Sequence, residues 1–491
     1  MVRDATPEEI HQSIEQAWKA FHAFRDRSRS ERAAFMRAIA SGLEDAGDAL
    51  IRIAMKETHL PEARLRNERV RTIFQLNSYA TACVQGDWLE ARIDTAIPDR
   101  NPPKPDIRKM LVPIGPVVVF GASNFPFAYS TAGGDTASAF AAGCPVIVKA
   151  HPAHPETSDA VASIIRQAVQ SCNMPDGLFQ HLHGASHEVG RSMVQHPRVK
   201  AVGFTGSFSG GKQLFDWAAQ RTEPIPVFAE MGSVNPVFLL PGKLAASADT
   251  MATQYAGSVT LGVGQFCTNP GLIIGIASES LTRFLHDLGK ALQAVTPAPM
   301  LHAGIASVYA SRREAALMQP DVHLVAESVQ APGPGEGQPT LATTDGDTFL
   351  NNPILHQEVF GPFSLVVACR DRSQLLEVAQ SLEGQLTCTV MASRQDLTEH
   401  TELIGLLKDR CGRLVLNGVP TGVEVCLSMQ HGGPFPATTD ARFGAVGADA
   451  IKRFARPFAW QNWEHEFLPD ELKDQNPCGI WRTVNEKLDR S

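Results

Sequence analysis

From residue 116 onwards, short apolar runs alternate with longer stretches that have the periodicity of amphipathic helices. Runs of four or five apolar residues predict buried strands, and apolar residues recurring every three or four positions predict helices. The first such region predicts strands at 116–120, 145–149 and 199–204 and helices at 127–142, 157–171 and 209–221. This alternation favours a parallel sheet covered by helices on both faces. Ligands bind such sheets beyond the carboxyl ends of the strands, where Asn124, Lys149 and Ser207 stand.

The rest of the chain predicts a second sheet and two flanking regions. Strands are predicted at 237–240, 272–276, 364–368 and 413–417, and a surface loop at 332–338. Residues 7–85 predict helices with interruptions at Gly42 and Gly47. The proline-rich stretch 97–105 predicts a connector or an extended arm. The tail from 452 carries tryptophans among many charges, which we interpret as an arm that packs on another subunit.

Charge and cysteine content exclude several classes of function. A net charge of −8 argues against nucleic acid or an anionic membrane as a partner. No apolar run has the length of a membrane helix, and the first residues lack the apolar core of a signal peptide. The 9 cysteines form no CxxC pair, which favours a reducing compartment, the cytoplasm, and no structural zinc. We expect no metal at His151 and His154 either, because prolines flank them and no acidic partner is near in sequence.

Cys267 stands in a loop of small residues, 262–271, directly ahead of the predicted strand 272–276. A thiol in such a loop can face a cleft, although most free cysteines are buried small hydrophobic groups. Only the thiolate attacks an electrophile, so a nucleophilic role also requires a base and groups that stabilise charge. Glu230 and Asn124 are the upstream candidates for these two roles.

Other motifs are ambiguous when taken singly. Gly206 and Ser207 form a turn between a predicted strand and helix, where free N–H groups suit a phosphate, but a plain capped turn fits equally well. Lys149 ends a strand, where it could hold a ribose or a phosphate or merely extend to solvent. Glu358 lies close to a glycine and could be a base, a ribose ligand or a member of a salt bridge.

In combination these motifs resemble the aldehyde dehydrogenase superfamily over roughly residues 10–460. They occur in the order Asn124-Phe-Pro, Lys149, Phe-Thr-Gly206-Ser207, Glu230-x-Gly232, Gly-Gln-x-Cys267 and Glu358-x-Phe360-Gly-Pro. The resemblance implies an α/β fold with an atypical Rossmann cofactor domain, an α/β catalytic domain and an oligomerisation arm. The implied boundaries are 1–231 for the cofactor domain (with 97–114 as arm), 232–450 for the catalytic domain and 451–491 for a C-terminal arm. A homodimer or homotetramer is implied as well.

The resemblance also implies roles for the catalytic residues. Cys267 would be the nucleophile that adds to the carbonyl of a small aldehyde substrate. The side-chain amide of Asn124 and the backbone N–H of Cys267 would stabilise the resulting oxyanion. Glu230 would activate the water that releases the acid from the thioester.

A nicotinamide cofactor follows from the same resemblance. The implied cofactor-binding residues are Lys149, Gly206, Ser207, Gly232, Glu358 and Phe360. Glu358 would bind the nicotinamide ribose, and Phe360 would lie beside the ring. Many NAD-preferring members carry a glutamate three residues after the lysine, but this chain has Pro152 there. No carboxylate at that position would repel a 2′-phosphate, so we expect NADP to be preferred and NAD to be tolerated.

The segments at 121–130, 149–155 and 431–438 resemble the 2,5-dioxovalerate (α-ketoglutarate semialdehyde) dehydrogenase subgroup, and also NADP-dependent fatty aldehyde dehydrogenases. The first alternative implies oxidation of 2,5-dioxopentanoate to 2-oxoglutarate, and the second a medium- or long-chain aldehyde. Glu230 argues against a CoA-acylating enzyme, and Cys267 with Asn124 against a binding protein that only retains the fold. Arg442 could contact a substrate carboxylate, but a surface ion pair is the favoured interpretation.

Overall fold

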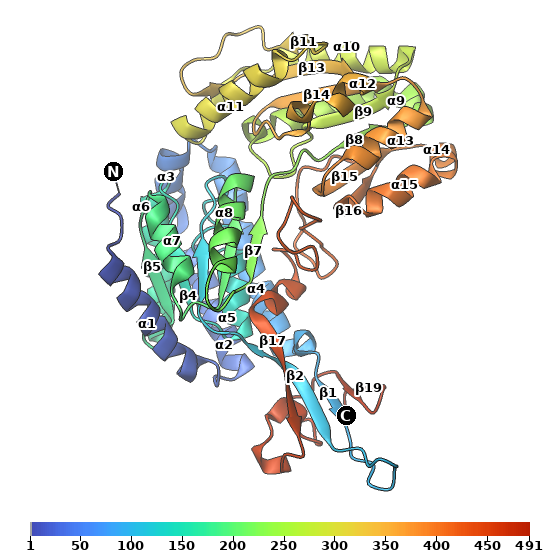
Figure 1. Cartoon of the computed structure of the whole chain (residues 1–491). Coiled ribbons are helices and arrows are strands. Elements are labelled where there is room, and N and C mark those ends of the chain that lie inside the picture. The colour runs from blue at the N-terminus through green and yellow to red at the C-terminus, as the bar shows by residue number, and fades with distance from the viewer. Residues whose placement is uncertain (1) are drawn as a thin grey trace.

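The computed structural model describes residues 2–491 as two α/β units and a protruding arm (Figure 1). The chain begins with α1 (Pro7–Phe24), α2 (Arg29–Asp45), α3 (Gly47–Thr58) and α4 (Glu62–Gln85). Capping boxes at Thr6 and Ser28 fix the starts of α1 and α2. The helices were predicted correctly, but Gly42 does not interrupt them. It lies inside α2, where an added Cβ would be 2.5 Å from Cγ2 of Ile164.

The first sheet is parallel, with strands in the order β5-β4-β3-β6-β7. Its strands are β3 (Val117–Phe120), β4 (Val146–Lys149), β5 (Phe179–Leu182), β6 (Ala201–Thr205) and β7 (Val227–Glu230), joined through α5 (Gly134–Ala142), α6 (Pro155–Ser171), α7 (His187–Gln195) and α8 (Phe208–Ala219). Val117 and Val119 pack toward α2, α5 and α6, whereas Val118 and Phe120 pack toward α1, α7 and α8. Both faces are therefore covered, as predicted.

Two details of this region differ from the sequence prediction. The helix expected at 127–142 begins only at Gly134, and residues 127–133 form turns instead. Ser130, Thr131 and Gly133 favour turns over helix, and the carbonyl of Ala128 would lie 2.5 Å from a Cβ at Gly133. The elements β5, α7 and β7 were not predicted at all.

The second sheet has the order β11-β13-β14-β9-β8-β15-β16 and is parallel except for β11 against β13. Its strands are β8 (Val237–Leu239), β9 (Leu272–Ile276), β11 (His323–Glu327), β13 (Thr340–Asp345), β14 (Phe363–Cys369), β15 (Gln385–Met391) and β16 (Cys411–Leu416). Its helices are α9 (Pro241–Thr260), α10 (Glu279–Gln293), α11 (Ala303–Leu317), α12 (Gly346–Asn351), α13 (Arg372–Ser381), α14 (Arg394–Glu399) and α15 (Thr401–Lys408). The four predicted strands are present, while β11, β13 and β15 were missed. The predicted loop at 332–338 contains the two-residue strand β12 (Glu336–Gly337), which pairs with β10 (Ala298–Pro299).

The arm is a third sheet with the order β17-β2-β1-β18-β19 (Figure 1, lower part). It is built from β1 (Arg92–Asp94), β2 (Ile107–Pro113), β17 (Ala455–Gln461), β18 (Arg482–Val484) and β19 (Lys487–Asp489). The C-terminal tail thus packs on the 107–113 strand of its own chain, with β17 antiparallel to β2.

The predicted domain boundary at 231/232 falls between the last strand of the first sheet and the first strand of the second. Residues 431–445, however, return to the first sheet, where the N–H of Met231 donates to the carbonyl of Ala437 at 2.7 Å. The short helix at Ala448–Phe454 packs on α5 of the same unit. The boundaries therefore stay a prediction, and the segment around 431 connects the two units.

Candidate active site

Cys267 is held in a loop whose backbone is fixed by side-chain amides. Its carbonyl accepts a hydrogen bond from Nδ2 of Asn235 at 2.8 Å, and Nδ2 of Asn269 donates to the carbonyl of Gly361 at 3.1 Å. The loop follows a left-handed turn in which Gly262 and Gly264 have φ values of 56° and 64°. Glycine is needed at both positions because an added Cβ is strained at positive φ. The half-buried thiol is thereby fixed just ahead of β9, as predicted.

The thiol of Cys267 lies beside a buried histidine and a buried glutamate. Its Sγ is 3.5 Å from Nε2 of His431, and the same Nε2 is 3.1 Å from Oε1 of Glu230. Burial, reinforced by the negative charge of Glu230, raises the pKa of Cys267 well above that of a free thiol. The resting sulfur is therefore protonated at neutral pH, and Nε2 of His431 is within reach of its proton.

Sequence reasoning placed Cys267 and Glu230 but gave His431 no chemical role. His431 comes from a segment 164 residues beyond Cys267, so spacing alone does not connect them. The sequence signal that could have identified His431 is the pair of glycines that follows it, Gly432 and Gly433. A Cβ at Gly433 would lie 2.1 Å from the carbonyl of Gln385, so only glycine allows this backbone to lie against β15. Such close backbone contact places the histidine at the end of β7.

Asn124 also reaches the thiol loop, from the turn that follows β3. Its Nδ2 donates to the carbonyl of Gln265 at 3.2 Å, two residues before Cys267. The carbonyl of Asn124 accepts a hydrogen bond from Nη2 of Arg64 at 2.6 Å. The primary amide has two hydrogens, so one remains for a substrate oxygen.

Glu358 lines a small cavity together with Phe360 and Ser233. Burial raises the pKa of Glu358 to about 7, against the opposing effects of the backbone N–H of Ser233 and the charge of Arg312. A Cβ at Gly232 would lie 2.8 Å from Oε2 of Glu358. Gly232 therefore leaves the space that the carboxylate occupies, and a ribose hydroxyl in this cavity would meet an acceptor.

Lys149, Gly206 and Ser207 lie at the carboxyl ends of β4 and β6, apart from the thiol. Ser207 caps α8 by accepting a hydrogen bond from the N–H of Gly210 at 3.2 Å. Burial lowers the pKa of Lys149, and Asp4 partly opposes this effect. The switch in strand order lies beside β3 and β6, which is where parallel sheets bind nucleotides.

Arg442 does not enter the site. It is exposed and pairs with Asp440, with Nη2 2.6 Å from Oδ2, which agrees with the surface role favoured from the sequence.

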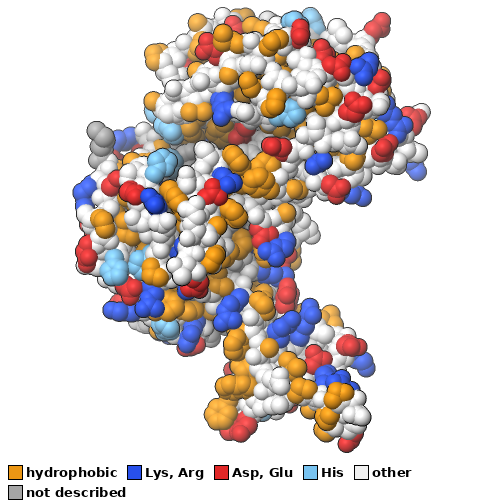
Figure 2. All heavy atoms as spheres, in the orientation of Figure 1, with side chains coloured by type: hydrophobic (Ala, Val, Ile, Leu, Met, Phe, Trp, Pro, Cys, Tyr) orange, Lys and Arg blue, Asp and Glu red, His pale blue; other side chains and the backbone are white. Residues whose placement is uncertain are grey.

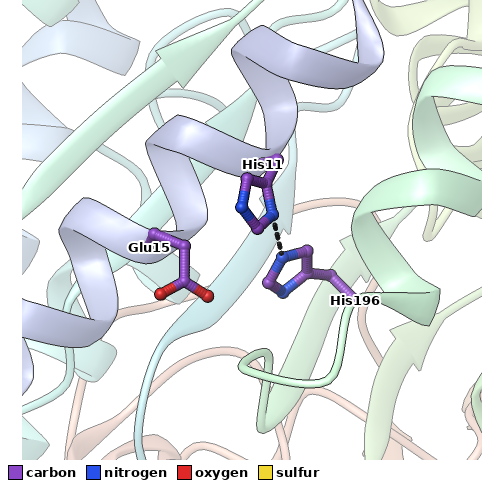
Figure 3. A group of neighbouring side chains, drawn as sticks. All are labelled: His11, Glu15 and His196. Atoms are coloured by element: carbon purple, nitrogen blue, oxygen red, sulfur yellow. Dashed lines mark hydrogen bonds between the residues drawn. The ribbon is translucent and has the colours of Figure 1, made fainter.

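His11, Glu15 and His196 form a separate surface cluster between α1 and the end of α7 (Figure 3). Nδ1 of His11 is 3.1 Å from Nε2 of His196. The N–H of Arg198 donates to Nδ1 of His196 at 3.2 Å, so the proton of the neutral ring stands on Nε2 and is donated to His11. Arg198 also pairs with Glu15 at 3.4 Å. Hydrogen bonds therefore account for this cluster without a metal ion.

Comparison with known proteins agrees with this geometry. The model of the aldehyde dehydrogenase family matches residues 1–435, and the chain belongs to this family. It is an enzyme that oxidises aldehydes with NAD or NADP as the electron acceptor. Within residues 2–491, none of the helices has the length and apolar character needed to span a bilayer.

Individual relatives cover nearly the whole chain. Alpha-ketoglutaric semialdehyde dehydrogenase 2 of Azospirillum brasilense is 46% identical over 99% of this chain and 93% of its own length. Alpha-ketoglutaric semialdehyde dehydrogenase of Acinetobacter baylyi is 45% identical over 99% and 92%. The structure of 1-pyrroline-5-carboxylate dehydrogenase from Thermus with bound NAD has a TM-score of 0.80 at 22% identity, covering 94% of this chain and 86% of that one. This similarity shows that the predicted fold is correct.

The raised pKa of Cys267 predicts how the thiol reacts with iodoacetamide. Only the thiolate is alkylated, so the rate should keep rising up to about pH 9 and beyond, without a plateau near neutrality. Glu230→Gln removes a negative charge that raises this pKa, so the variant should react faster at pH 7. The rate is measured by mass spectrometry of the Cys267 peptide, with the exposed Cys426 as internal standard. A plateau below about pH 7 in the parent enzyme would contradict the assignment.

Proposed function

We propose that this enzyme oxidises 2,5-dioxopentanoate to 2-oxoglutarate through a thioester on Cys267. The substrate assignment rests on the 46% identity, over nearly full length, to an alpha-ketoglutaric semialdehyde dehydrogenase. The observation that supports the mechanism is the contact of one histidine nitrogen with both Cys267 and Glu230.

In the first half-reaction, His431 accepts the thiol proton at Nε2, and Sγ of Cys267 adds to the aldehyde carbonyl. The imidazolium that forms is stabilised by Oε1 of Glu230 at 3.1 Å. The backbone N–H of Cys267 and the remaining amide hydrogen of Asn124 stabilise the oxyanion. A nicotinamide held by Glu358 and Phe360 would supply the hydride acceptor, and loss of the hydride from the tetrahedral carbon would leave a thioester on the sulfur of Cys267.

In the second half-reaction, Glu230 accepts a proton from the water that attacks the thioester. The C–S bond then breaks, and His431 returns its proton to the leaving sulfur. Glu230 then releases to solvent the proton that it took from water, so the products are the carboxylic acid, the free thiol and one proton, and atoms and charges balance.

For the cofactor, we propose that Glu358, Phe360 and Gly232 form the nicotinamide-ribose side of the site. Lys149, Gly206 and Ser207 would hold the adenosine ribose and the pyrophosphate at the edge of the first sheet. NADP is the proposed preference because Pro152 places no carboxylate where the 2′-phosphate would lie. Among residues 2–491, Asp4 is the acidic group whose charge acts on Lys149.

We further propose a homodimer or homotetramer assembled through the arm. Hydrophobic side chains gather on the arm (Figure 2), where Phe467 is 63% and Leu488 70% exposed. The edge strand β16 exposes Leu414 and Leu416 and offers a second apolar surface. A reducing compartment such as the cytoplasm is proposed because all 9 cysteines are free.

The substrate assignment predicts a preference for the short oxo acid over neutral aldehydes. The kcat/KM for 2,5-dioxopentanoate, measured with NADP, should exceed those for hexanal and decanal by about tenfold or more, because a buried contact to a carboxylate discriminates strongly. Cys267→Ala is the control and should lose activity toward all three. If decanal is oxidised tenfold better than the oxo acid, the enzyme is a fatty aldehyde dehydrogenase.

The cofactor assignment predicts the behaviour of Pro152→Glu. The new carboxylate should raise the Kd for NADP by about tenfold through like-charge repulsion, with a smaller change for NAD. Binding is measured by titration calorimetry, with Pro152→Gln as the uncharged control. A parent enzyme that already binds NAD much more tightly than NADP would refute the proposed preference.

A further inference from the structure

Three arginines lie within electrostatic reach of the thiol, and the proposed mechanism uses none of them. Arg64 and Arg71 come from α4, and Arg413 comes from β16. Burial lowers the pKa of Arg64 and of Arg413, and a negative charge at Cys267 opposes this effect. The pKa of Arg71 is raised against the effect of burial, by Tyr129 and by the charge of Cys267, so all three lie in the electrostatic reach of the sulfur. No hydrogen bond joins any of these guanidinium groups to a carboxylate within residues 2–491.

Arg64 is committed to positioning other site residues. Besides its hydrogen bond to the carbonyl of Asn124, its guanidinium carbon lies 4.6 Å from the ring centre of Phe266 and 5.0 Å from that of Phe125. Phe266 directly precedes Cys267. Arg64 therefore fastens the oxyanion residue and the thiol loop to α4.

Both Nη atoms of Arg413 donate to neutral acceptors, while its Nε is buried without a partner among the described residues. Its two Nη atoms donate to the carbonyls of Pro420 at 2.9 Å and Gly422 at 3.2 Å, and Nη1 also lies 3.8 Å from Sδ of Met429. It holds the loop that leads to His431 and leaves its charge uncompensated by any hydrogen-bonded anion in the described chain.

Arg71 differs from the other two because its unpartnered Nη1 is not enclosed, whereas Nη1 of Arg64 and Nε of Arg413 are buried without a partner in the described part of the chain. Its Nη2 donates to Oη of Tyr129 at 2.9 Å, and its Nε is enclosed without a partner. Nη1 makes no hydrogen bond within residues 2–491 and is not enclosed by protein. The ring of Tyr129 is centred 6.3 Å from that of His431, so Tyr129 links the guanidinium of Arg71 to the histidine that contacts the thiol.

One buried carboxylate, Glu68, faces this cluster. Its Oε1 accepts hydrogen bonds from the N–H groups of Phe127 at 2.8 Å and Ala128 at 3.0 Å. Burial raises the pKa of Glu68, while Arg64 and Arg71 oppose this rise. Glu230, the other nearby acid, is engaged by His431. Three cations against two carboxylates, Glu68 and Glu230, leave an excess of one positive charge, which is costly in a half-buried site unless a ligand supplies an anion.

We propose that Arg71 binds the carboxylate of the substrate, the one at the end remote from the aldehyde. Its open Nη1 is the direct donor, Tyr129 holds the guanidinium in place, and Arg413 adds charge on the other side of His431. The ligand class is a short chain with an aldehyde at one end and a carboxylate at the other. This inference rests on the proposed function and names the group that selects its substrate.

The test compares an acid with its neutral counterpart in Arg71→Met, which keeps the length of the side chain and removes the charge. For 5-oxopentanoate, kcat/KM should fall by about 100-fold, and for pentanal it should stay within about threefold, because pentanal has no carboxylate to lose. Arg442→Met, a change at an exposed ion pair, is the matched control and should leave both values unchanged. Arg71→Lys should recover only part of the loss, since an ammonium group lacks the planar fork.

A binding measurement separates this role from a structural one. Glutarate should protect Cys267 from iodoacetamide in the parent enzyme and in Arg442→Met, but not in Arg71→Met. The proposal would be overturned if Arg71→Met lowered kcat/KM equally for 5-oxopentanoate and pentanal. It would also be overturned if glutarate still protected Cys267 from iodoacetamide in Arg71→Met. If the parent prefers the acid and Arg71→Met does not change this, the proposed function stands and the carboxylate site is elsewhere. If the parent does not prefer 2,5-dioxopentanoate but Arg71→Met selectively loses 5-oxopentanoate, the site stands and the proposed substrate is wrong.

Discussion

The proposed chemistry depends on one nitrogen, Nε2 of His431, which contacts both the thiol of Cys267 and the carboxylate of Glu230. A buried thiol beside a negative charge is a poor nucleophile, because both effects raise its pKa. A base in contact with it removes that obstacle, and the same carboxylate that raises the pKa of the thiol then stabilises the imidazolium. Glu230 thus opposes ionisation of Cys267 in the resting state and favours it once the proton has moved to His431.

Much of the fold serves to bring these three groups together. Glu230 ends the last strand of the first sheet, Cys267 precedes a strand of the second, and His431 comes from a segment that runs back from the second sheet to the first. Glycines make this return possible, since the backbone of 432–433 touches the starts of β15 and β16. The arginines on α4 and β16 approach the same point from the remaining sides, so the thiol lies where all parts of the fold meet.

The sequence predicted those features that local patterns encode. Alternating apolar runs identified seven strands and both sheets, because buried parallel strands are continuously apolar. The strand β5 was missed, since Gln180 and His181 interrupt its apolar run, and 127–133 was wrongly assigned to a helix. Cys267, Glu230 and Asn124 stood out through neighbouring glycines, prolines and small residues. The placement of His431 and Arg71 beside the thiol depends on contacts between distant segments, which no local pattern contains.

The proposed roles of His431 in acylation and of Glu230 in hydrolysis are tested most directly by a single-turnover experiment on Glu230→Gln. His431 is intact in this variant, so Cys267 should still be acylated, and reduced cofactor should appear in a burst of about one equivalent per subunit. Without the carboxylate, water is not activated, and steady turnover should be slower by about 100-fold or more. The absorbance of the reduced cofactor, followed in stopped flow, measures both phases. A burst that is lost in proportion to steady turnover would show that Glu230 does not act on the thioester and would contradict the account.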